Sequence, residues 1–225
     1  MTDDNRPIPF PQLGGEYPKI QTVFERDPAT NFKTLLPSYA LPEFAYLAKN
    51  EWVFTEKVDG TNIRLTRKDG QPVIGGRTDN AQIPTYLLPR LRELVDRLCA
   101  SDLADMTLYG EGFGAKIQKG GGNYIPNGTD FVLFDIMCGG FWLERANVED
   151  VAQKLDIPVV PIVGFGTLHD AIEQTKAGMT STWGPFVMEG LVMRPAVELV
   201  NRRGDRIISK IKHRDFAAAR AEAAA

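Results

Sequence analysis

Lys57 lies in a segment whose residue types could support covalent chemistry on a phosphate group. An apolar run at 52–54 leads into Lys57-Val-Asp-Gly60. A lysine near the end of a rigid strand can be a nucleophile, and a glycine turn beside it lets a phosphate approach the backbone closely. The alternative is a solvated lysine at a strand end. Lys-x-Asp-Gly is a weak motif by itself, so this segment alone leaves both interpretations open.

Other nucleotide-binding and catalytic motifs are missing from the sequence. It has no G-x-x-x-x-G-K-[ST] loop and no G-x-S-x-G elbow, and Gly110-Glu-Gly-Phe-Gly114 has the wrong spacing for a dinucleotide fingerprint. The two histidines, His169 and His213, lie at no zinc-ligand spacing. We therefore expect any metal to be a hard, oxygen-bound ion such as magnesium.

The composition is that of an ordinary globular protein. The 225 residues are 43% hydrophobic and 24% charged. No apolar run reaches the roughly 18 residues that a membrane span needs, and the N-terminus lacks the apolar core of a secretory signal. Cys99 and Cys138 show no pairing pattern, as expected for reduced thiols. We expect a soluble, cytoplasmic protein that does not bind membranes.

The net charge of −3 counts against a nucleic-acid binder, which usually carries a basic excess. The segment 202–214 is a local exception, because it holds six basic residues against Asp205 alone. The local excess of basic residues is therefore compatible with a basic face there. Lys19 and Arg26, in a strand-like segment at 17–26, could also contact phosphates, although a solvated strand face is the alternative.

The elements that must position these residues are strands interspersed with helices. Alternation and apolar runs predict strands near 17–26, 52–57, 62–67, 72–74, 107–109, 131–137, 159–165, 186–195 and 206–212, and helical spacing and caps predict helices near 86–100, 147–155 and 167–178. The Asp-Gly at 69–70 predicts a hairpin turn, and 119–124 reads as a flexible loop. This order favours the α+β class with mainly antiparallel sheets.

We found no internal repeat and no change of composition that marks a second domain. The sequence predicts an extended Pro- and Gly-rich arm at 1–16, one domain at 17–216 and an Ala-rich tail at 217–225.

Five segments, in order, resemble motifs of the covalent nucleotidyltransferases, the superfamily of DNA ligases, RNA ligases and mRNA capping enzymes. Motifs I, III, IIIa, IV and V are matched by Lys57-Val-Asp-Gly60, Tyr109-Gly-Glu111, Phe134-Asp-Ile136, Glu189 to Pro195 and Lys210-Ile-Lys212. Asn62, five residues after the lysine, resembles the RNA ligase 2 type of ATP-dependent RNA ligase, as does Gly76-Arg77-Thr. The chain departs from the pattern of these relatives after motif V, where we expect neither an OB domain nor a helical C-terminal domain.

The resemblance implies a ligase adenylation domain, with antiparallel sheets flanked by helices and ATP bound in the groove between them. Lys57 would attack the α-phosphate of ATP, which forms lysyl-AMP and releases pyrophosphate. AMP would then pass to an RNA 5′-phosphate, and a 3′-hydroxyl would displace it. Free lysine has a pKa of about 10.4, and neighbouring Lys210 and Lys212, or Mg²⁺, would disfavour its charged form.

The resemblance also assigns roles to other residues. Glu189 would bind the metal or a water near the α-phosphate, and Glu111 would contact ribose or metal. Phe134 would stack on adenine, although core packing is the alternative for an aromatic residue within an apolar strand. The remaining contacts would be Arg77 on ribose or phosphate, Asn62 on pyrophosphate or the RNA end, Glu56 at the adenine pocket, and Lys210 and Lys212 on the phosphates. For the charged residues, exposed surface charge is the alternative.

The resulting hypothesis is an ATP-dependent RNA ligase that uses Mg²⁺ or Mn²⁺. Its substrates would be RNA 3′-OH and 5′-phosphate ends or a nicked duplex, and it would act as a monomer, with a helper protein in place of a C-terminal domain. Two alternatives stay open: a DNA nick-sealing enzyme or stand-alone adenylyltransferase, and a degenerate domain that only binds nucleotide or RNA. The intact set of lysines with Glu189 disfavours the degenerate domain.

Overall fold

The computed structural model describes residues 12–217, which divide into two compact units. Within these residues, unit 1 comprises 12–17, Gly60–Val159 and Arg202–Asp205, and unit 2 comprises Pro18–Asp59, Val160–Asn201 and 206–217. A unit boundary thus falls within the segment that follows Lys57. Most of the predicted arm (1–16) and of the predicted tail (217–225) lies outside the described residues, and the predicted domain limits of 17–216 stay a prediction.

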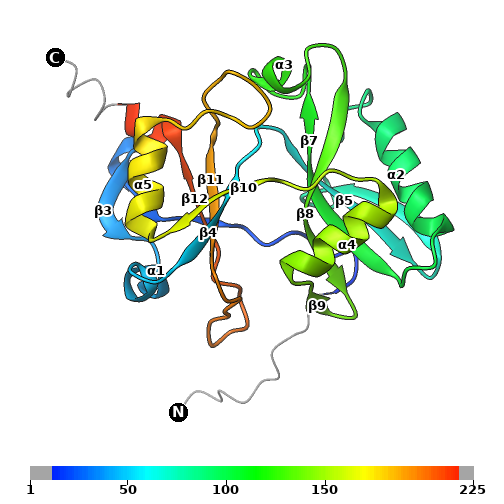
Figure 1. The fold of residues 1–225 in the computed structure, drawn as a ribbon, viewed down its shortest axis with the longest axis horizontal. Helices are drawn as coiled ribbons and strands as arrows, with labels where there is room; N and C mark the ends of the chain where they lie inside the picture. The colour runs from blue at the N-terminus through cyan, green and yellow to red at the C-terminus, as the bar shows by residue number, and fades with distance from the viewer. Residues whose placement is uncertain (1–11, 218–225) are drawn as a thin grey trace. The chain divides into compact units, whose positions relative to one another are not determined.

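Unit 1 is built on a five-stranded antiparallel sheet with helices packed on one face (Figure 1). In spatial order its strands are β6 (Gln71–Gly76), β5 (Thr61–Lys68), β7 (Met106–Gly114), β8 (Thr129–Cys138) and β9 (Phe141–Trp142). The helices α2 (Leu88–Ala100) and α4 (Arg145–Leu155) bury their apolar sides against it, and α3 (Gly121–Tyr124) is a single turn. The core of this unit therefore lies between the helices and one face of the sheet.

The β5–β6 hairpin confirms the turn predicted from Asp-Gly. Asp69 and Gly70 both have positive φ angles, 51° and 73°. Turns with this backbone twist match the twist of the flanking strands and favour Asp-Gly.

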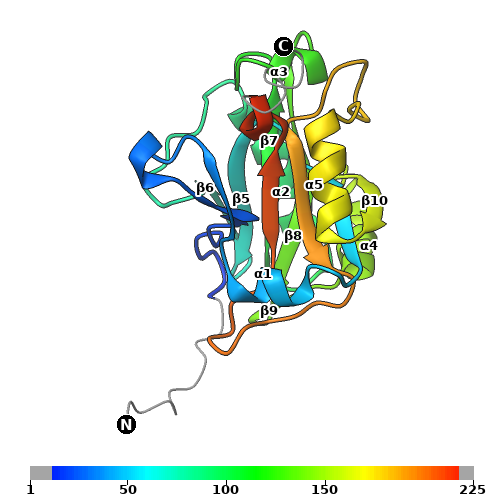
Figure 2. The ribbon, with the colours of Figure 1, turned by 90° about the vertical axis from the view of Figure 1, so that its left-hand side faces the viewer.

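Unit 2 has a second five-stranded sheet, with the order β1 (Gln21–Thr22), β12 (Ser209–Lys212), β11 (Gly190–Pro195), β4 (Trp52–Glu56) and β10 (Ile162–Gly166). Its strand pairs are antiparallel except β1 with β12. Figure 2 shows α5 (Leu168–Ala177) beside β11 and β12, where its apolar side meets residues of both strands. The remaining elements are the β2–β3 hairpin (Phe24–Arg26 and Leu35–Tyr39), α1 (Pro42–Leu47) and the short 3-10 helices η1 (Pro28–Thr30) and η2 (His213–Phe216).

The capping prediction for α5 is confirmed, and the one for α4 is wrong. Thr167 and Asp170 form a reciprocal capping box at the start of α5. The α4 helix begins at Arg145 after Glu144, which makes no side-chain cap, so Asn147 lies inside the helix. Helix ends are set by backbone geometry and packing as well as by capping residues. The same capping pattern therefore marks the start of α5 but not that of α4.

Local sequence patterns also misplaced several elements of unit 2. The segment predicted as one strand at 17–26 is split into β1 and β2, which belong to different sheets. The following loop contains β3 and α1, and β11 begins only at Gly190. In unit 1, the predicted loop at 119–124 contains α3. Short strands take their partners from distant segments, and local alternation does not encode that choice. The α+β class with mainly antiparallel sheets is confirmed.

Within residues 12–217, none of the helices combines the length and the apolar character that a membrane crossing requires.

Candidate active site

Lys57 and Lys212 share the carboxylate of Glu189. The ammonium nitrogen (Nζ) of Lys57 lies 2.5 Å from Oε2 of Glu189, and that of Lys212 lies 2.5 Å from Oε1. The three side chains are largely buried, with 19%, 17% and 11% of the Lys57, Lys212 and Glu189 side chains exposed. The structure therefore brings together three predicted site residues that are far apart in the sequence.

Backbone bonds fix this arrangement at the ends of three adjacent strands. The amide of Lys57, just past β4, donates to the carbonyl of Gly190 over 2.9 Å, and the amide of His213 donates to the carbonyl of Glu189 over 2.9 Å. A side chain at Gly190 would not fit, because its β-carbon would lie 2.0 Å from the carbonyl oxygen of Ile211. This contact explains why a glycine follows Glu189.

The two carboxylates near Lys57, Glu189 and Asp59, have pKa values that are shifted in opposite directions. Burial raises the pKa of Glu189, but attraction to Lys57 and hydrogen bonds from both lysines outweigh it, so its pKa is below the usual value. The pKa of Asp59 is raised, first by burial and then by repulsion from Glu189. Glu189 therefore carries the negative charge that balances the lysines.

Lys210 lies on the same face of β12 as Lys212, two residues away. Burial and repulsion from Lys57 and Lys212 lower the pKa of Lys210 to about 8. An incoming phosphate would favour the protonated form of Lys210, because it supplies a negative charge next to the ammonium group. The predicted role of Lys210 as a phosphate contact fits this position.

Glu56, predicted at the adenine pocket, is 1% exposed in β4. One carboxylate oxygen accepts from the hydroxyl of Ser181 over 2.6 Å, and the other accepts from the backbone and the hydroxyl of Thr182, both over 2.9 Å. These bonds tie the 181–182 segment to β4. Sequence reasoning missed Ser181 and Thr182, because no motif marks them, and a contact of Glu56 with adenine stays a prediction.

In unit 1, Asn62 and Glu111 form a cross-strand pair between β5 and β7, and Glu111 in turn faces Val132 of β8. Directly opposed residues project from the same face of a sheet. Ile63, the next residue of β5, lies in the helix-covered core, so Asn62 and Glu111 are on the other face. Oδ1 of Asn62 is buried and has no hydrogen-bond partner among the described residues.

Phe134 lies at an irregularity in β8. The register of β7 with β8 passes from Tyr109 opposite Asp135 to Gly110 opposite Leu133, so Phe134 has no direct partner on β7. Bulges of this kind re-aim a side chain and are frequent near active sites. Phe134 is partly exposed, and its ring packs against Tyr17 with centroids 5.0 Å apart. Tyr17 in turn donates to the buried carboxylate of Asp135.

Gly60 begins unit 1 and packs closely against β7. A β-carbon at Gly60 would lie 2.2 Å from the carbonyl oxygen of Gly112. The glycine of Lys-Val-Asp-Gly is thus explained by a close approach of two backbones. Arg77, one residue after the end of β6, is exposed.

The basic residues of the segment 202–214 are divided between the two units. Arg202 and Arg203 belong to unit 1, whereas Arg206 belongs to unit 2 and pairs with Glu198 over 3.2 Å. Three other basic residues of this segment line one pocket of unit 2: Lys210, Lys212 and Arg214.

A family model described as RNA ligase matches residues 50–212, which is more than half of the chain. The chain belongs to the RNA ligase family. The matched range contains every motif on which the predicted resemblance rested, from Lys57 to Lys212. No curated protein sequence matches the chain.

Solved structures of one RNA ligase, from Naegleria gruberi, resemble this family member in fold. The structure with PPi is 21% identical with a TM-score of 0.61, and the match covers 94% of this chain and 61% of that one. A mutant with ATP and Mn is 22% identical with a TM-score of 0.60, covering 91% and 61%. A mutant with AMP and Mn is 19% identical with a TM-score of 0.61, covering 95% and 61%. The chain spans about 61% of the length of these proteins, and the likeness confirms the fold.

The carboxylates of this RNA ligase family member fit a magnesium or manganese ion only in part. Among residues 12–217, no group of three or more His, Cys, Asp or Glu side chains could hold a metal ion. Mg²⁺, however, is usually held by one or two carboxylates together with substrate phosphates and waters. Glu189, with Asp59 close enough to repel it, fits that pattern within unit 2. Glu111, the other predicted metal ligand, lies in unit 1, and its role stays a prediction.

Proposed function

We propose that this chain carries out ATP-dependent RNA ligation through a lysyl-AMP intermediate on Lys57. The observation that supports this most directly is the pairing of Lys57 and Lys212 with one carboxylate, Glu189, in a chain of the RNA ligase family. The fold relatives from Naegleria gruberi are described with ATP and Mn, with AMP and Mn, and with PPi. In such an adenylylation ATP is the substrate, AMP is the group that is transferred and PPi is the leaving group. ATP and Mg²⁺ or Mn²⁺ are accordingly the proposed cofactors.

In this proposal, Glu189 holds the amine of Lys57 in place before ATP binds. The amine must become neutral and leave this ion pair before it can attack the α-phosphate. Lys210 and Lys212 stand on one strand face where they would neutralise the charge that develops on the phosphate oxygens. A divalent ion bound at Glu189 would supply further positive charge, which stabilises both the phosphate oxygens and the uncharged lysine.

Nucleotide contacts are also proposed for four residues of unit 1. Phe134 would stack on adenine, and the orphaned oxygen of Asn62 would accept a hydrogen bond from the ligand. Glu111 and Arg77 keep their proposed roles at ribose or phosphate. The substrates would be RNA 3′-OH and 5′-phosphate ends. A nicked duplex, a helper protein, a monomeric state and a cytoplasmic location are further proposals.

Incubation with α-³²P-labelled ATP and Mg²⁺ or Mn²⁺, followed by a denaturing gel, tests the adenylylation step. Label should stay on the protein, resist base and be lost in acid. Lys57→Ala should remove it. Lys57→Arg should also remove it, because arginine remains charged at any accessible pH and is a poor nucleophile. Lys49→Ala, at an exposed lysine of the same unit, is the matched control and should label like the wild type.

If Lys57→Ala retains as much label as the wild type, Lys57 is not the nucleophile. The labelled protein is then offered matched RNA and DNA ends and nicks. Faster sealing of all-DNA nicks would contradict the RNA assignment. Transfer of AMP to a 5′-phosphate without sealing would indicate a stand-alone adenylyltransferase.

A further inference from the structure

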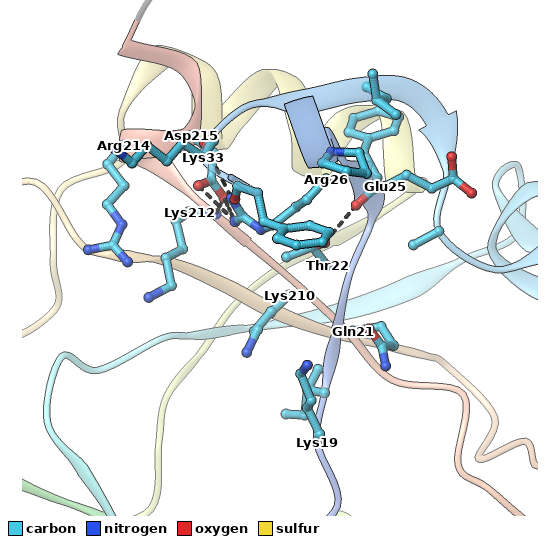
Figure 3. A pocket seen from close by; sticks show the side chains of 16 residues that line it. Lys19, Gln21, Thr22, Glu25, Arg26, Lys33, Lys210, Lys212, Arg214 and Asp215 are labelled. Carbon is cyan, nitrogen blue, oxygen red and sulfur yellow. Dashed lines mark hydrogen bonds and ion pairs between the residues drawn. The ribbon is translucent and has the colours of Figure 1, made fainter. Parts of the chain in front are cut away.

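Unit 2 contains a pocket of about 1090 Å³ beside the lysines of β12. Its walls come from the segment around β1, from the β2–β3 hairpin and from the end of β12 with η2 (Figure 3). This volume is slightly above the ~300–1,000 Å³ typical of ligand pockets. The motif lysines Lys210 and Lys212 account for only part of its lining, and the hairpin belongs to none of the five motifs.

Most of the positive charge in this pocket is unbalanced. Its two carboxylates are engaged: Asp215 accepts from Arg26 over 2.9 and 3.0 Å, and Glu25 accepts from Ser38 over 2.6 Å. Lys212 is paired with Glu189. The other four basic side chains form no ion pair within residues 12–217, namely Lys19, Lys33, Lys210 and Arg214.

These side chains are close enough to act together. In Figure 3, Lys19, Lys210, Lys212 and Arg214 extend toward the same opening. Lys19 and Lys210 line the same pocket, and repulsion from Lys19 contributes to the lowered pKa of Lys210. Clustered, unpaired cations with a shared opening favour binding of an extended anion.

An exposed aromatic ring lies in the same lining. Phe32 is 59% exposed and has a φ angle of 59°, directly after Asn31 with a φ angle of 54°. This conformation costs a bulky residue about 1–2 kcal/mol. The backbone is held in it, because the amide of Phe32 donates to the carbonyl of Asp27 over 2.9 Å and Arg26 donates to the carbonyl of Phe32 over 3.3 Å.

We propose that this pocket, which we call the hairpin pocket, binds a single-stranded RNA end, with backbone phosphates on its unpaired basic side chains and one base on Phe32. Cationic grooves that carry exposed aromatic rings are the usual platform for single-stranded nucleic acids. Pyrophosphate would use the charge but not the ring. The inference rests on the proposed ligase function, because that function supplies RNA as the substrate.

The bound segment would belong to the strand with the 5′-phosphate or to the strand with the 3′-hydroxyl, which share the same backbone chemistry. Lys210 and Lys212 connect the hairpin pocket to Lys57, since Lys212 lines the pocket and pairs with the carboxylate that holds Lys57. The pocket is thus placed to hold the strand close to the reacting lysine.

Fluorescence anisotropy of a labelled single-stranded RNA with the full chain tests the proposal. Phe32→Asn removes the ring and suits the backbone conformation, so it should weaken binding about tenfold without loss of thermal stability. Phe32→Tyr should restore binding. Phe165→Asn is the matched control, because Phe165 is 60% exposed on β10 of the same unit, and it should bind like the wild type.

Salt dependence tests the phosphate contacts separately. Lys19→Ala with Lys33→Ala should reduce the slope of log affinity against log salt by about 1.4, which corresponds to two phosphate contacts on a single strand. Oligonucleotides with a 5′-phosphate or with a 5′-hydroxyl show which strand is held. A Phe32→Asn variant that binds RNA like the wild type would overturn the proposal. Lysine variants that leave the salt slope of RNA binding unchanged would also overturn it, even if added pyrophosphate competes less well with RNA on them.

A failure of the ligase function would look different. Phe32→Asn leaves Lys57, Glu189 and the basic side chains intact, so lysyl-AMP should form on this variant as on the wild type. Loss of labelling in the wild type would contradict the proposed function, whereas normal labelling with unchanged RNA binding in Phe32→Asn would contradict only the hairpin pocket.

Discussion

In unit 2 the carboxylate of Glu189 already accepts from two ammonium groups, whereas in unit 1 the amide oxygen of Asn62 is buried with no partner among the described residues. A ligand that reaches Glu189 must replace existing ion pairs. A ligand that reaches Asn62 can add a hydrogen bond that the free protein lacks. Substitutions in the first region should therefore change the free protein, and substitutions in the second should mainly change the complex.

Glu189→Gln should produce the largest change in the free protein. It removes the one negative charge that Lys57 and Lys212 share, and leaving buried charges without a counter-charge typically costs about 3 kcal/mol. Urea unfolding followed by circular dichroism measures this cost. Glu173→Gln, at an exposed glutamate of α5, is the control and should shift the free energy of unfolding by no more than about 0.5 kcal/mol. Equal free energies of unfolding for Glu189→Gln and Glu173→Gln would contradict the proposed difference between the two regions.

Asn62→Ala should give the reverse pattern, with a smaller effect. The free protein should keep its stability, because Oδ1 makes no hydrogen bond there. Affinity for a non-hydrolysable ATP analogue should fall by about three- to tenfold, the value of one hydrogen bond. Calorimetric titration together with a thermal melt provides both measurements. Asn50→Ala, at an exposed asparagine, should leave both unchanged. A destabilised Asn62→Ala with unaltered affinity would contradict the assignment of the orphaned oxygen to a ligand.

Lys210→Met should produce the smallest effect, and its sign depends on pH. The pKa of Lys210 in the folded chain, about 8, lies below its ordinary value of 10.5. Folding therefore carries the full cost of the charged lysine below pH 8, and this cost disappears as the pH rises from about 8 to about 10.5. The variant should melt a few degrees above the wild type at pH 7, and the difference should shrink at pH 10. Lys176→Met, at an exposed lysine of α5, should show no such trend.

The sequence was informative wherever local pattern and chemistry coincide. Asp69-Gly70 specifies its turn, and Thr167 and Asp170 specify the cap of α5. The ordered motifs from Lys57 to Lys212 indicate the family, which the match to the RNA ligase family then shows. Each of these signals depends on residues that are close in sequence or on a fixed order of motifs. The α+β class followed from the same alternation.

The remaining features depend on contacts between distant segments. No residue near Glu56 in the sequence predicts that Ser181 and Thr182 donate hydrogen bonds to its carboxylate. The split of 17–26 into two sheets is decided by β12 and β3, and the hairpin pocket depends on that split. Pairing of Lys57 and Lys212 through one carboxylate is likewise a tertiary fact. Sequence order predicted that these residues act together but not which of them bond.

The aromatic packing around Phe134 gives the chain a built-in optical probe. The ring of Tyr17 lies 5.0 Å from that of Phe134 and 5.7 Å from that of Trp142, and Trp142 also lies 5.3 Å from Tyr109. A base that stacks on Phe134 would shift Tyr17 and thereby the surroundings of this indole. Nucleotide entry should therefore register in the emission of Trp142, so that binding could be timed in a stopped-flow instrument without any attached dye.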